Sequence, residues 1–528
     1  MKKDRADIVI IGAGAAGSAG AWNLSENSNF KIICLEQGPE LEQSKFPKSK
    51  AEQISTSDFD IDPNQRDLKS DYPIDNTASP ISISNYNAVG GSTILYSGHI
   101  PRFHVNDFKS YTVDNVGEDW PLDYFELEPY YQLNDQKMRV AGMTGDPSYP
   151  PIEKLDYPIP LGRGGEKLAS AFGGLGWHWW PSYSSVISNT GIEKRFIKKG
   201  IFNSGLSVAQ TYWPLAIKNG VDLRPNCRVL QICLDNFGNA KKVIYEDEKN
   251  NLRTIEASVF ILACSGAGTP RLLLNSFRKG GTDGICNSSG MVGKNLMLHP
   301  LGYVEGLFEE YLETSFGPQG CCFVSNEFYA SRPENSFKRG YMMHVLRGPD
   351  PLDTALSLRK FKKLDFGKEF KRQFLESYGK IIPIAIICED LPEQSNYIEL
   401  DENNVDSSGM AGIKVKYTLS DNSKKMLSHG ISKAKKVLKY AGAKSIKGFG
   451  PVRHTGWHIM GTTKMGLDPA TSVVNKFGQT HDVKNLLIID SSVFITSAAV
   501  NPTATIQALA LYFTHNLIKN TDQFAPKS

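Results

Sequence analysis

The sequence lacks the features that mark several classes of protein. None of its eight cysteines forms a C-x-x-C pair, so their spacing predicts neither a zinc nor an iron–sulfur site. No apolar stretch reaches the roughly 18 residues needed to cross a bilayer. A net charge of +3 over 528 residues favours neither a nucleic-acid partner nor an acidic-surface partner. We find no repeats and no low-complexity tail. What remains is the composition of an ordinary globular protein, long enough for two or three domains.

The amino terminus also lacks the pattern of a secretory signal. Met1-Lys2-Lys3 is followed by the charged residues Asp4 and Arg5 and then by an apolar run, with no small-residue cleavage site. We therefore expect a cytoplasmic protein. Cys34 and Cys264 lie inside apolar runs, which predicts that they are small buried core residues.

A nucleotide-binding pattern follows this amino terminus. Residues 6–11 form an apolar run of strand length, residues 18–24 have a helical pattern, and residues 31–35 form a second apolar run that ends at Glu36. The G-x-G-x-x-G fingerprint of Gly12, Gly14 and Gly17 lies between the first strand and the helix. This order favours a dinucleotide site over a plain glycine-rich turn.

Each position in the fingerprint has a physical role. Gly12 permits a tight turn, Gly14 lets the backbone approach a pyrophosphate, and Gly17 allows close packing of helix and strand. The helix N-terminus offers free N–H groups to the phosphates, and Glu36 can accept hydrogen bonds from ribose hydroxyls. The fingerprint alone does not distinguish FAD from NAD.

Three further segments carry a resemblance to a known family. They are N-A-V-G-G-S-T-I-L-Y-S-G-H-I-P-R-F (87–103), G-W-H-I-M-G-T-T-K-M-G (456–466) and V-N-P-T-A-T-I-Q-A-L-A (500–510). Together they resemble the glucose–methanol–choline (GMC) oxidoreductases, and most closely the bacterial branch with gluconate and fructose dehydrogenase flavoproteins and pyranose oxidases. The resemblance runs through the whole chain in the right order.

The resemblance implies an α/β FAD-binding Rossmann-like domain of the p-hydroxybenzoate-hydroxylase type, joined to an α+β substrate domain with an antiparallel sheet. Residues 1–160, 205–300 and 450–528 would form the discontinuous FAD-binding domain, and residues 161–204 and 301–449 the substrate-binding domain. Strand patterns at 221–232, 242–245 and 259–263 would return to the first sheet. Alternating patterns at 381–387 and 412–417 suit an antiparallel sheet with one face toward a pocket.

The family pattern also implies the cofactor contacts. Gly90, Gly91 and Ser92 would pack against the FAD pyrophosphate and flavin edge, although a glycine turn in a hairpin is the alternative for that segment. Val229 would contact adenine, and Asp490 the ribityl chain or pyrophosphate. The remaining expected contacts are Tyr96, in the loop after Ser92, and Pro502 and Thr503, where the last helix begins with its N-terminus toward the flavin.

We expect the FAD to be bound without a covalent link. Some relatives attach it through a histidine in this loop, but here the stretch reads Ile94-Leu95-Tyr96 and His99 comes too late to reach. Two other segments are notable, one because it departs from the family pattern and one because its own pattern is weak. Residues 193–202 are basic where several relatives carry a cysteine-containing loop, and polar residues 40–71 suit either a lid over the flavin or a surface loop.

Oxidation of an alcohol requires a base for the hydroxyl proton and a hydride acceptor, here the flavin N5. The family places its main catalytic histidine at His458, whose imidazole suits general-base work. The histidines that compete with His458 for the role of base are His299, in a motif the family uses structurally, His454 and His99. The alternative for His458 is that it is a core histidine with all its hydrogen bonds made and no role in catalysis. Asn501 would orient the substrate oxygen, or it caps the last helix, or it does both.

The leading hypothesis is therefore an FAD-dependent enzyme that oxidises an alcohol group of a sugar, cyclitol or other polyol, as a dehydrogenase or an oxidase. The electron acceptor would be O2, a quinone or a redox protein. One rival is a flavin-containing lyase of the hydroxynitrile-lyase type. A second is a flavoprotein subunit of a larger electron-transfer complex with a redox partner subunit. We expect no metal, no nucleic-acid partner and no membrane span.

Overall fold

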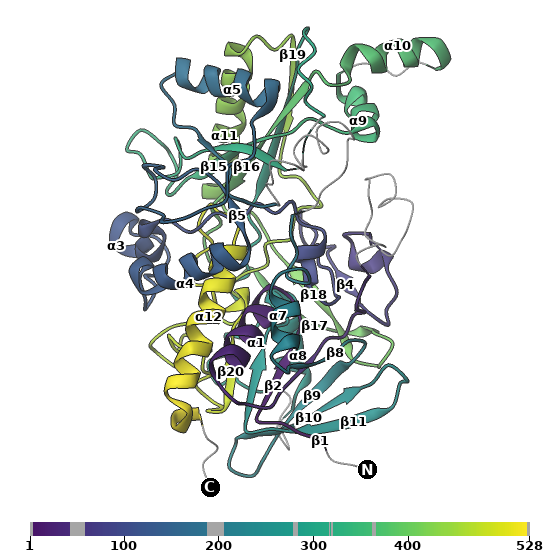
Figure 1. The fold of residues 1–528 in the computed structure, drawn as a ribbon, viewed down its shortest axis with the longest axis vertical. Coiled ribbons are helices and arrows are strands. Elements are labelled where there is room, and N and C mark those ends of the chain that lie inside the picture. Colours follow the sequence, from purple (N-terminus) through teal and green to yellow (C-terminus); the bar gives the residue numbers. More distant parts are fainter. Residues whose placement is uncertain are drawn as a thin grey trace.

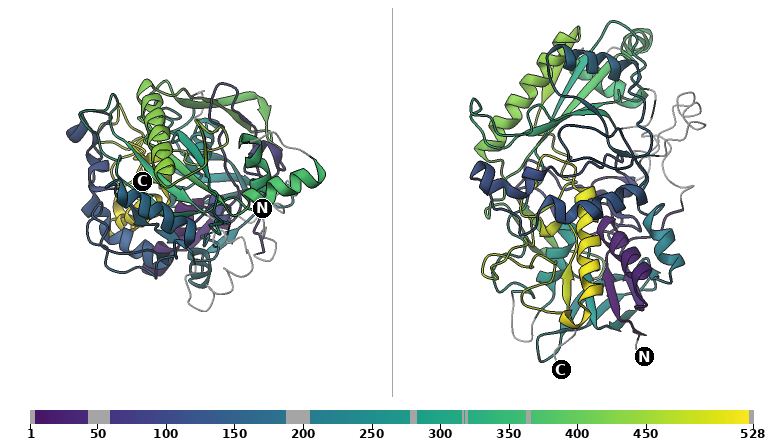
Figure 2. Two further views of the ribbon diagram at one scale, coloured as in Figure 1. Left: turned by 90° about the horizontal axis from the view of Figure 1, so that it is seen from above. Right: turned by 60° about the vertical axis from the view of Figure 1, so that its left-hand side comes forward.

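A computed structural model describes residues 4–42, 59–186, 205–277, 283–315, 317, 320–361 and 366–524. The molecule is elongated, with a parallel sheet in the half that carries both chain ends and an antiparallel sheet in the opposite half (Figure 1). A second view shows both termini at the same end (Figure 2). The predicted combination of a Rossmann-like α/β part with an antiparallel-sheet part is confirmed.

A five-stranded parallel sheet forms the core of the first half. Its order is β20 (Leu486–Ile488), β12 (Val259–Leu262), β2 (Ile8–Ile11), β3 (Ile32–Leu35) and β8 (Asp222–Arg224). The three central strands are buried along their whole length, as expected for a parallel sheet covered on both faces. Helices α1 (Ala15–Asn27) and α12 (Thr503–Lys519) pack against each other beside it.

A second, mostly antiparallel sheet lies next to the first. It has the order β1 (Asp4–Arg5), β11 (Leu252–Glu256), β10 (Ala240–Glu246) and β9 (Arg228–Leu234). The expectation that residues 221–232 and 242–245 return to the first sheet is therefore wrong beyond β8, because β9 and β10 belong to the second sheet. Asn226 has a positive φ of 54°, and this turn sends the following residues into the second sheet as β9.

The opposite half is built on a six-stranded antiparallel sheet. Its order is β19 (Ser445–Phe449), β13 (Leu301–Leu307), β16 (Ile381–Cys388), β15 (Tyr341–Leu346), β14 (Cys321–Ser325) and β6 (Trp180–Pro181). Helices α11 (Asp421–Tyr440) and α5 (Gly162–Gly174) cover one face, where Val304, Ile384 and Ile386 join their core. Since side chains alternate along a strand, Leu301, Ala385 and Ile387 face the other way, toward a cavity.

The remaining elements connect these sheets. A three-stranded sheet has the order β17 (Tyr397–Val405), β18 (Ala411–Lys416) and β4 (Ile74–Asp75), and β5 (Val140–Ala141) pairs with β7 (Ser184–Ser185). The other α-helices are α3 (Ser110–Asp114), α4 (Tyr124–Lys137), α7 (Tyr212–Lys218), α8 (Ser265–Asn275), α9 (Pro351–Phe361) and α10 (Gly367–Ser377). Short 3₁₀ helices are η3 (Pro63–Gln65), η4 (Gly91–Ile94), η5 (Val105–Lys109), η6 (Ser491–Val493) and η7 (Thr521–Phe524).

The sheets follow most of the expected domain segments. Strands of the parallel sheet come from 1–160, 205–300 and 450–528, and strands of the six-stranded sheet come from 161–204 and 301–449. Strands β17 and β18 fall inside 301–449 but join β4 of the other segment. The division into two domains stays a proposal.

No helix in the described part of the chain is long and apolar enough to cross a membrane. The location of the protein in the cell stays a prediction.

A buried ionic cluster joins segments that are distant in sequence. Arg339, which is 2% exposed, donates to Asp107 in η5 at 2.6 Å, to Asp114 in α3 at 3.0 Å and to Glu389 after β16 at 2.8 Å. Charge-assisted hydrogen bonds of this kind are strong because water is excluded from them. The cluster therefore ties the end of β16 to the segment around η5 and α3.

Candidate active site

A cavity of about 850 Å³ lies between the parallel sheet and the six-stranded sheet. Of the fourteen residues predicted from the sequence, twelve line it: Gly12, Gly14, Glu36, Gly91, Ser92, Tyr96, Val229, His458, Asp490, Asn501, Pro502 and Thr503. Gly17 and Gly90 lie behind its wall. Residues from nearly the whole length of the chain thus meet at one place.

The three fingerprint glycines have three different surroundings. A Cβ on Gly12 would come within 2.4 Å of the Ala263 carbonyl oxygen, and a Cβ on Gly17 within 2.0 Å of the Gly12 carbonyl oxygen. These two glycines are therefore required by packing. A Cβ on Gly14 would meet nothing closer than 3.9 Å, because Gly14 faces the cavity. Helix α1 begins immediately after it, and no side chain caps its N-terminus. This arrangement leaves backbone N–H groups available for a phosphate.

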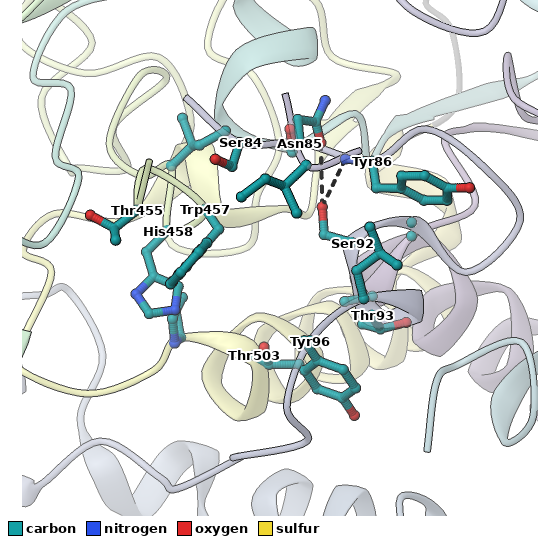
Figure 3. Close-up of a pocket in the computed structure, with 18 of the residues that line it drawn as sticks. Ser84, Asn85, Tyr86, Ser92, Thr93, Tyr96, Thr455, Trp457, His458 and Thr503 are labelled. Atoms are coloured by element: carbon teal, nitrogen blue, oxygen red, sulfur yellow. Dashed lines mark hydrogen bonds between the residues drawn. The ribbon is translucent and has the colours of Figure 1, made fainter. Parts of the chain in front are cut away.

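The second glycine pair packs on the first glycine loop. The Gly90 N–H donates to the Ala13 carbonyl oxygen at 2.9 Å, and a Cβ on Gly91 would come within 2.9 Å of Gly14 Cα. Ser92 Oγ accepts a hydrogen bond from the Tyr86 N–H at 3.2 Å (Figure 3). The hairpin alternative for this segment is wrong, since residues 91–94 form the 3₁₀ helix η4.

Glu36 is held at the end of β3 by the backbone. Its carboxylate accepts hydrogen bonds from the N–H groups of Ala13 at 2.8 Å and Gly38 at 2.9 Å. Burial raises the pKa of Glu36 to about 7, and the two N–H groups oppose this shift. A carboxylate has about four acceptor sites and Glu36 lines the cavity, so the residue can still accept ribose hydroxyls. Val229 lines the same part of the cavity from β9.

Asp490 follows the strand β20 and is the N-cap residue of η6. It accepts hydrogen bonds from Thr269 Oγ1 at 2.5 Å and from the N–H groups of Ser265 at 3.1 Å and Ser492 at 2.9 Å. Burial raises its pKa, while these bonds act to lower it. The carboxylate therefore has a fixed orientation at the cavity wall, next to the start of α8.

The loop after Ser92 and the start of the last helix close the cavity from another side. The Tyr96 hydroxyl donates to the Leu206 carbonyl oxygen at 2.7 Å. Pro502 occupies the N-cap position of α12 and Thr503 the first helical position, with no side chain capping the helix. The interpretation of Asn501 as the N-cap is therefore wrong, and the N-terminus of α12 is left open toward the cavity.

Asn501 contacts the predicted base instead. Its Nδ2 lies 3.4 Å from His458 Nε2, and its Oδ1 is buried without a hydrogen-bond partner among the described residues. Both atoms belong to a side chain that lines the cavity. An acceptor without a partner, next to an imidazole, suits the hydroxyl of a substrate.

His458 has a partner that the sequence did not reveal. Its Nδ1 lies 2.9 Å from Nδ1 of His299, and Nε2 of His299 lies 2.8 Å from the Ala498 carbonyl oxygen and 3.1 Å from that of Ser497. Carbonyl oxygens only accept hydrogen bonds, so Nε2 of His299 carries its proton. Burial lowers the pKa of His299 to about 4, and this residue is therefore neutral with Nδ1 as an acceptor.

These contacts determine the protonation of His458. Because Nδ1 of His299 accepts, Nδ1 of His458 must donate. Burial, followed by the neighbouring His299 and His344, lowers the pKa of His458 well below its usual value, so its imidazole is neutral. Its Nε2 therefore carries a lone pair at the cavity, as a base requires. His299 was expected to have only a structural place in its motif; nothing in the sequence pairs it with His458.

The six-stranded sheet and segments beside it form the rest of the cavity wall. An apolar patch of Leu301, Ala385 and Ile387 lines the cavity, and Leu346 and Val452 pack against it. His344 lines it from β15 and His99 from the loop after Tyr96. His454, a competitor for the role of base, also lines the cavity. Figure 3 shows His458 and Trp457 across the opening from Ser92 and Tyr96.

Two predicted features lie wholly or partly outside the described residues. They are the basic stretch 193–202 and residues 43–58 of the polar segment 40–71.

Comparisons with known proteins agree with this geometry. Two family models, both described as GMC oxidoreductase, match residues 200–301 and 392–510. A 2-methyl-1,2-propanediol dehydrogenase of Mycolicibacterium austroafricanum is 37% identical over 96% of this chain and 94% of its own. The fructose dehydrogenase large subunit of Gluconobacter japonicus is 26% identical over 96% of both chains.

Solved structures show the same fold. Pyridoxine 4-oxidase from Mesorbium loti matches with a TM-score of 0.65 and 15% identity, over 97% of this chain and 98% of that one. A formate oxidase from Aspergillus oryzae RIB40, described for FAD modification, matches with a TM-score of 0.65 and 16% identity over 99% of this chain and 100% of that one. The chain belongs to the GMC oxidoreductase family and is an FAD-dependent alcohol oxidoreductase.

Proposed function

We propose that the chain oxidises a hydroxyl-bearing carbon of a diol, sugar or other polyol, with His458 as general base. The observation that carries this proposal is the tautomer of His458, whose Nε2 lone pair is directed to the cavity because His299 accepts from Nδ1. FAD, when bound, accepts the hydride at its N5. Every other step falls to side chains of this chain.

The residues around Nε2 of His458 have different roles toward the substrate hydroxyl. His458 Nε2 takes the hydroxyl proton, and the positive charge that follows is shared with His299 through the bond between the two Nδ1 atoms. Asn501 Nδ2, which lies 3.4 Å from His458 Nε2, can donate to the same substrate oxygen. Its Oδ1, buried without a hydrogen-bond partner among the described residues, can accept from a second hydroxyl of the substrate. His458 itself is buried, and burial strengthens the polar interactions of its imidazole.

The apolar patch and its neighbours bear on the substrate class. Leu301, Ala385 and Ile387 offer a surface for carbon-bound hydrogens, and the histidines beside them offer partners for further hydroxyls. This mixture suits a molecule with several hydroxyls on a compact carbon skeleton. The similarity to a 2-methyl-1,2-propanediol dehydrogenase adds small branched diols to the sugars and cyclitols expected from the sequence.

We further propose that FAD is held without a covalent link. The loop residues Leu95, Tyr96 and Ser97 line the cavity and include no histidine. His99 also lines the cavity, but it comes after the position at which some relatives carry the linking histidine. Residues that fit the cofactor are the open Gly14, the free N-termini of α1 and α12, and the carboxylates of Glu36 and Asp490.

The deciding experiment is an anaerobic screen of 1,2-diols, sugars and cyclitols against purified holoenzyme. Bleaching of the flavin absorbance by one of these classes is the expected result. If a cyanohydrin is cleaved while no alcohol bleaches the flavin, the protein is a lyase and the proposal is wrong.

A role as one subunit of a larger dehydrogenase is the second candidate. The similarity to the large subunit of a fructose dehydrogenase favours it. Turnover of the lone chain with an artificial electron acceptor, compared with its turnover after addition of cell extract, would distinguish a self-sufficient enzyme from one that needs a redox partner. The natural acceptor would then be sought among O2, quinones and redox proteins.

A further inference from the structure

Three buried side chains with metal-binding atoms converge beside the cavity. They are His99, Cys321 and His344, which are 3%, 7% and 4% exposed. One nitrogen or sulfur atom from each lies within 4.8 Å of those from the other two. Cys321 has no place in the cofactor or substrate roles assigned above, whereas His99 and His344 line the cavity and were considered there as partners for further substrate hydroxyls.

We propose that His99, Cys321 and His344 bind one thiophilic transition-metal ion, with copper preferred to zinc. The spacing of the ligand atoms needs only small side-chain movements to reach a common ion. Two residues of this site, His99 and His344, line the cavity but are not among the residues assigned to FAD, and the geometry of the three side chains does not depend on the proposed reaction.

His99 supplies the clearest sign of a missing partner. Its Nδ1 is bonded to Ser182 Oγ at 2.7 Å, while its Nε2 is buried without a hydrogen-bond partner in the described part of the chain. Burial lowers the pKa of His99 to about 3, so the imidazole is neutral. With the proton on Nδ1, Nε2 presents a buried lone pair. Metal-bound histidines are commonly oriented in this way, through a hydrogen bond at the other nitrogen.

The two neighbouring strands bring Cys321 and His344 to the same face. Cys321 on β14 is the register partner of Leu346 on β15, and His344 lies two residues before Leu346. Side chains two apart on a strand share a face. Cys322 points the other way, into the core under α5 and α11. One of two adjacent cysteines is therefore at the site and the other is not.

Binding would change the state of the thiol. Cys321 Sγ donates to the Phe323 carbonyl oxygen at 3.0 Å, and burial raises the pKa of the thiol. A bound cation stabilises the thiolate, so that a sulfur–metal bond forms and one proton is released to solvent. The two imidazoles are already neutral and release none.

The chemistry of the proposed ligands favours copper. Two imidazoles and one thiolate are also acceptable to zinc. Met342 lies on the same face of β15, however, with its Sδ 3.2 Å from His344 Nε2. Two histidines and a cysteine with a nearby thioether form the ligand set of copper sites that carry a weak axial methionine. A substrate hydroxyl is the other conceivable partner of His99 Nε2, but it gives no reason for the thiol to be there.

The test is copper binding by the holoenzyme after treatment with a chelator. Cuprous ion is added in competition with a chromophoric chelator, and cupric ion is added while absorbance is recorded beyond the flavin bands. We expect one copper per chain and a thiolate-to-copper charge-transfer band. In Cys321→Ser the band should disappear, and copper affinity should fall by at least about 10–100-fold, the loss that even changes beside a metal ligand produce.

Cys322→Ser is the matched control, since it removes an adjacent buried thiol that faces the opposite core. It should keep both the copper and the band. Flavin content and melting temperature of both variants, measured without metal, show whether they are folded. If either falls in Cys321→Ser, His344→Gln replaces it in the comparison.

Three results would overturn the proposal. They are failure of the wild type to bind copper, equal binding by Cys321→Ser, and tighter binding of zinc than of copper at one equivalent. A fourth would identify the rival occupant: if His99→Leu raises KM for polyols in a protein that binds no metal, His99 Nε2 serves the substrate. Because metal binding is measured without turnover, the first three outcomes do not depend on whether the proposed reaction is right; only the KM comparison does.

Discussion

Replacing His299 by leucine should slow reduction of the flavin although His299 does not reach the substrate. The 2.9 Å bond between the two Nδ1 atoms keeps the proton of His458 on Nδ1. Without an acceptor this buried N–H loses its partner, at a cost of about 1–3 kcal/mol. The tautomer with the proton on Nε2 becomes favoured by a similar amount, and that tautomer has no lone pair for the substrate. A free-energy difference of this size corresponds to about a 5–150-fold lower rate.

The assay is anaerobic stopped-flow reduction at saturating substrate, so that reoxidation cannot mask the defect. His458→Ala should be slower still, since general-base catalysis contributes about 10²–10⁴-fold. His299→Gln should recover part of the rate, because its amide can donate to a carbonyl and accept from His458. Equal flavin content in all three variants shows that they are folded.

The pH profile separates this role from a merely structural one. The pKa of His458 is lowered well below its usual value by burial, so the base is neutral at neutral and alkaline pH and is lost only in acid. Reduction by the wild type should therefore be independent of pH above about 6.5, the usual histidine value. His458→Ala should instead become faster as pH rises, because the substrate hydroxyl must ionise unaided. Wild-type reduction that rises through pH 7–9, or His299→Leu at the wild-type rate, would refute the reasoning.

Four further outcomes follow from the structure. Gly14→Val should fold but purify without FAD, because its Cβ has room in the protein and projects into the cavity; a yellow, fully loaded variant would contradict this. Acid precipitation should release the flavin into the supernatant, and colour kept in the pellet would show a covalent link. Asn501→Ala should reduce the flavin more slowly at an unchanged melting temperature, since the residue caps no helix; a stability loss with normal reduction would reverse that assignment. Arg339→Met should lower the free energy of unfolding by about 3–5 kcal/mol in urea, because three buried carboxylates lose their cation; a change below about 1 kcal/mol would show that the carboxylates find other partners.

The parts of the fold that the sequence predicted are those encoded by contiguous residues. The strands around Gly12 and Glu36 could be predicted because an apolar run, a glycine turn and a second run follow in order. The alternation at 381–387 predicted a strand with two different faces, and β16 has them. The resemblance supplied His458 and Asn501, because their motifs are also contiguous.

The parts that could not be predicted depend on tertiary placement. His299 lies 159 positions from His458, and only the folded chain shows that their Nδ1 atoms meet. The cluster of His99, Cys321 and His344 draws on a loop and two strands, so no spacing rule for metal ligands could find it. The capping interpretation of Asn501 failed because the turn before Pro502 directs the side chain to the cavity, which a helix-start pattern does not encode.

The order of strands in the parallel sheet means that the sheet cannot be completed until most of the chain has been synthesised. Strand β2 pairs with β12, and β12 pairs with β20, which begins about 475 residues after β2 ends. At about 5–20 residues per second, the ribosome takes roughly 25–95 s to deliver β20 after β2 has been made. Until then the edge of β12 that pairs with β20 is unpaired, and β2 belongs to an incomplete sheet. Nascent chains should therefore depend on chaperones, and truncation before residue 486 should give an aggregating product that binds no flavin.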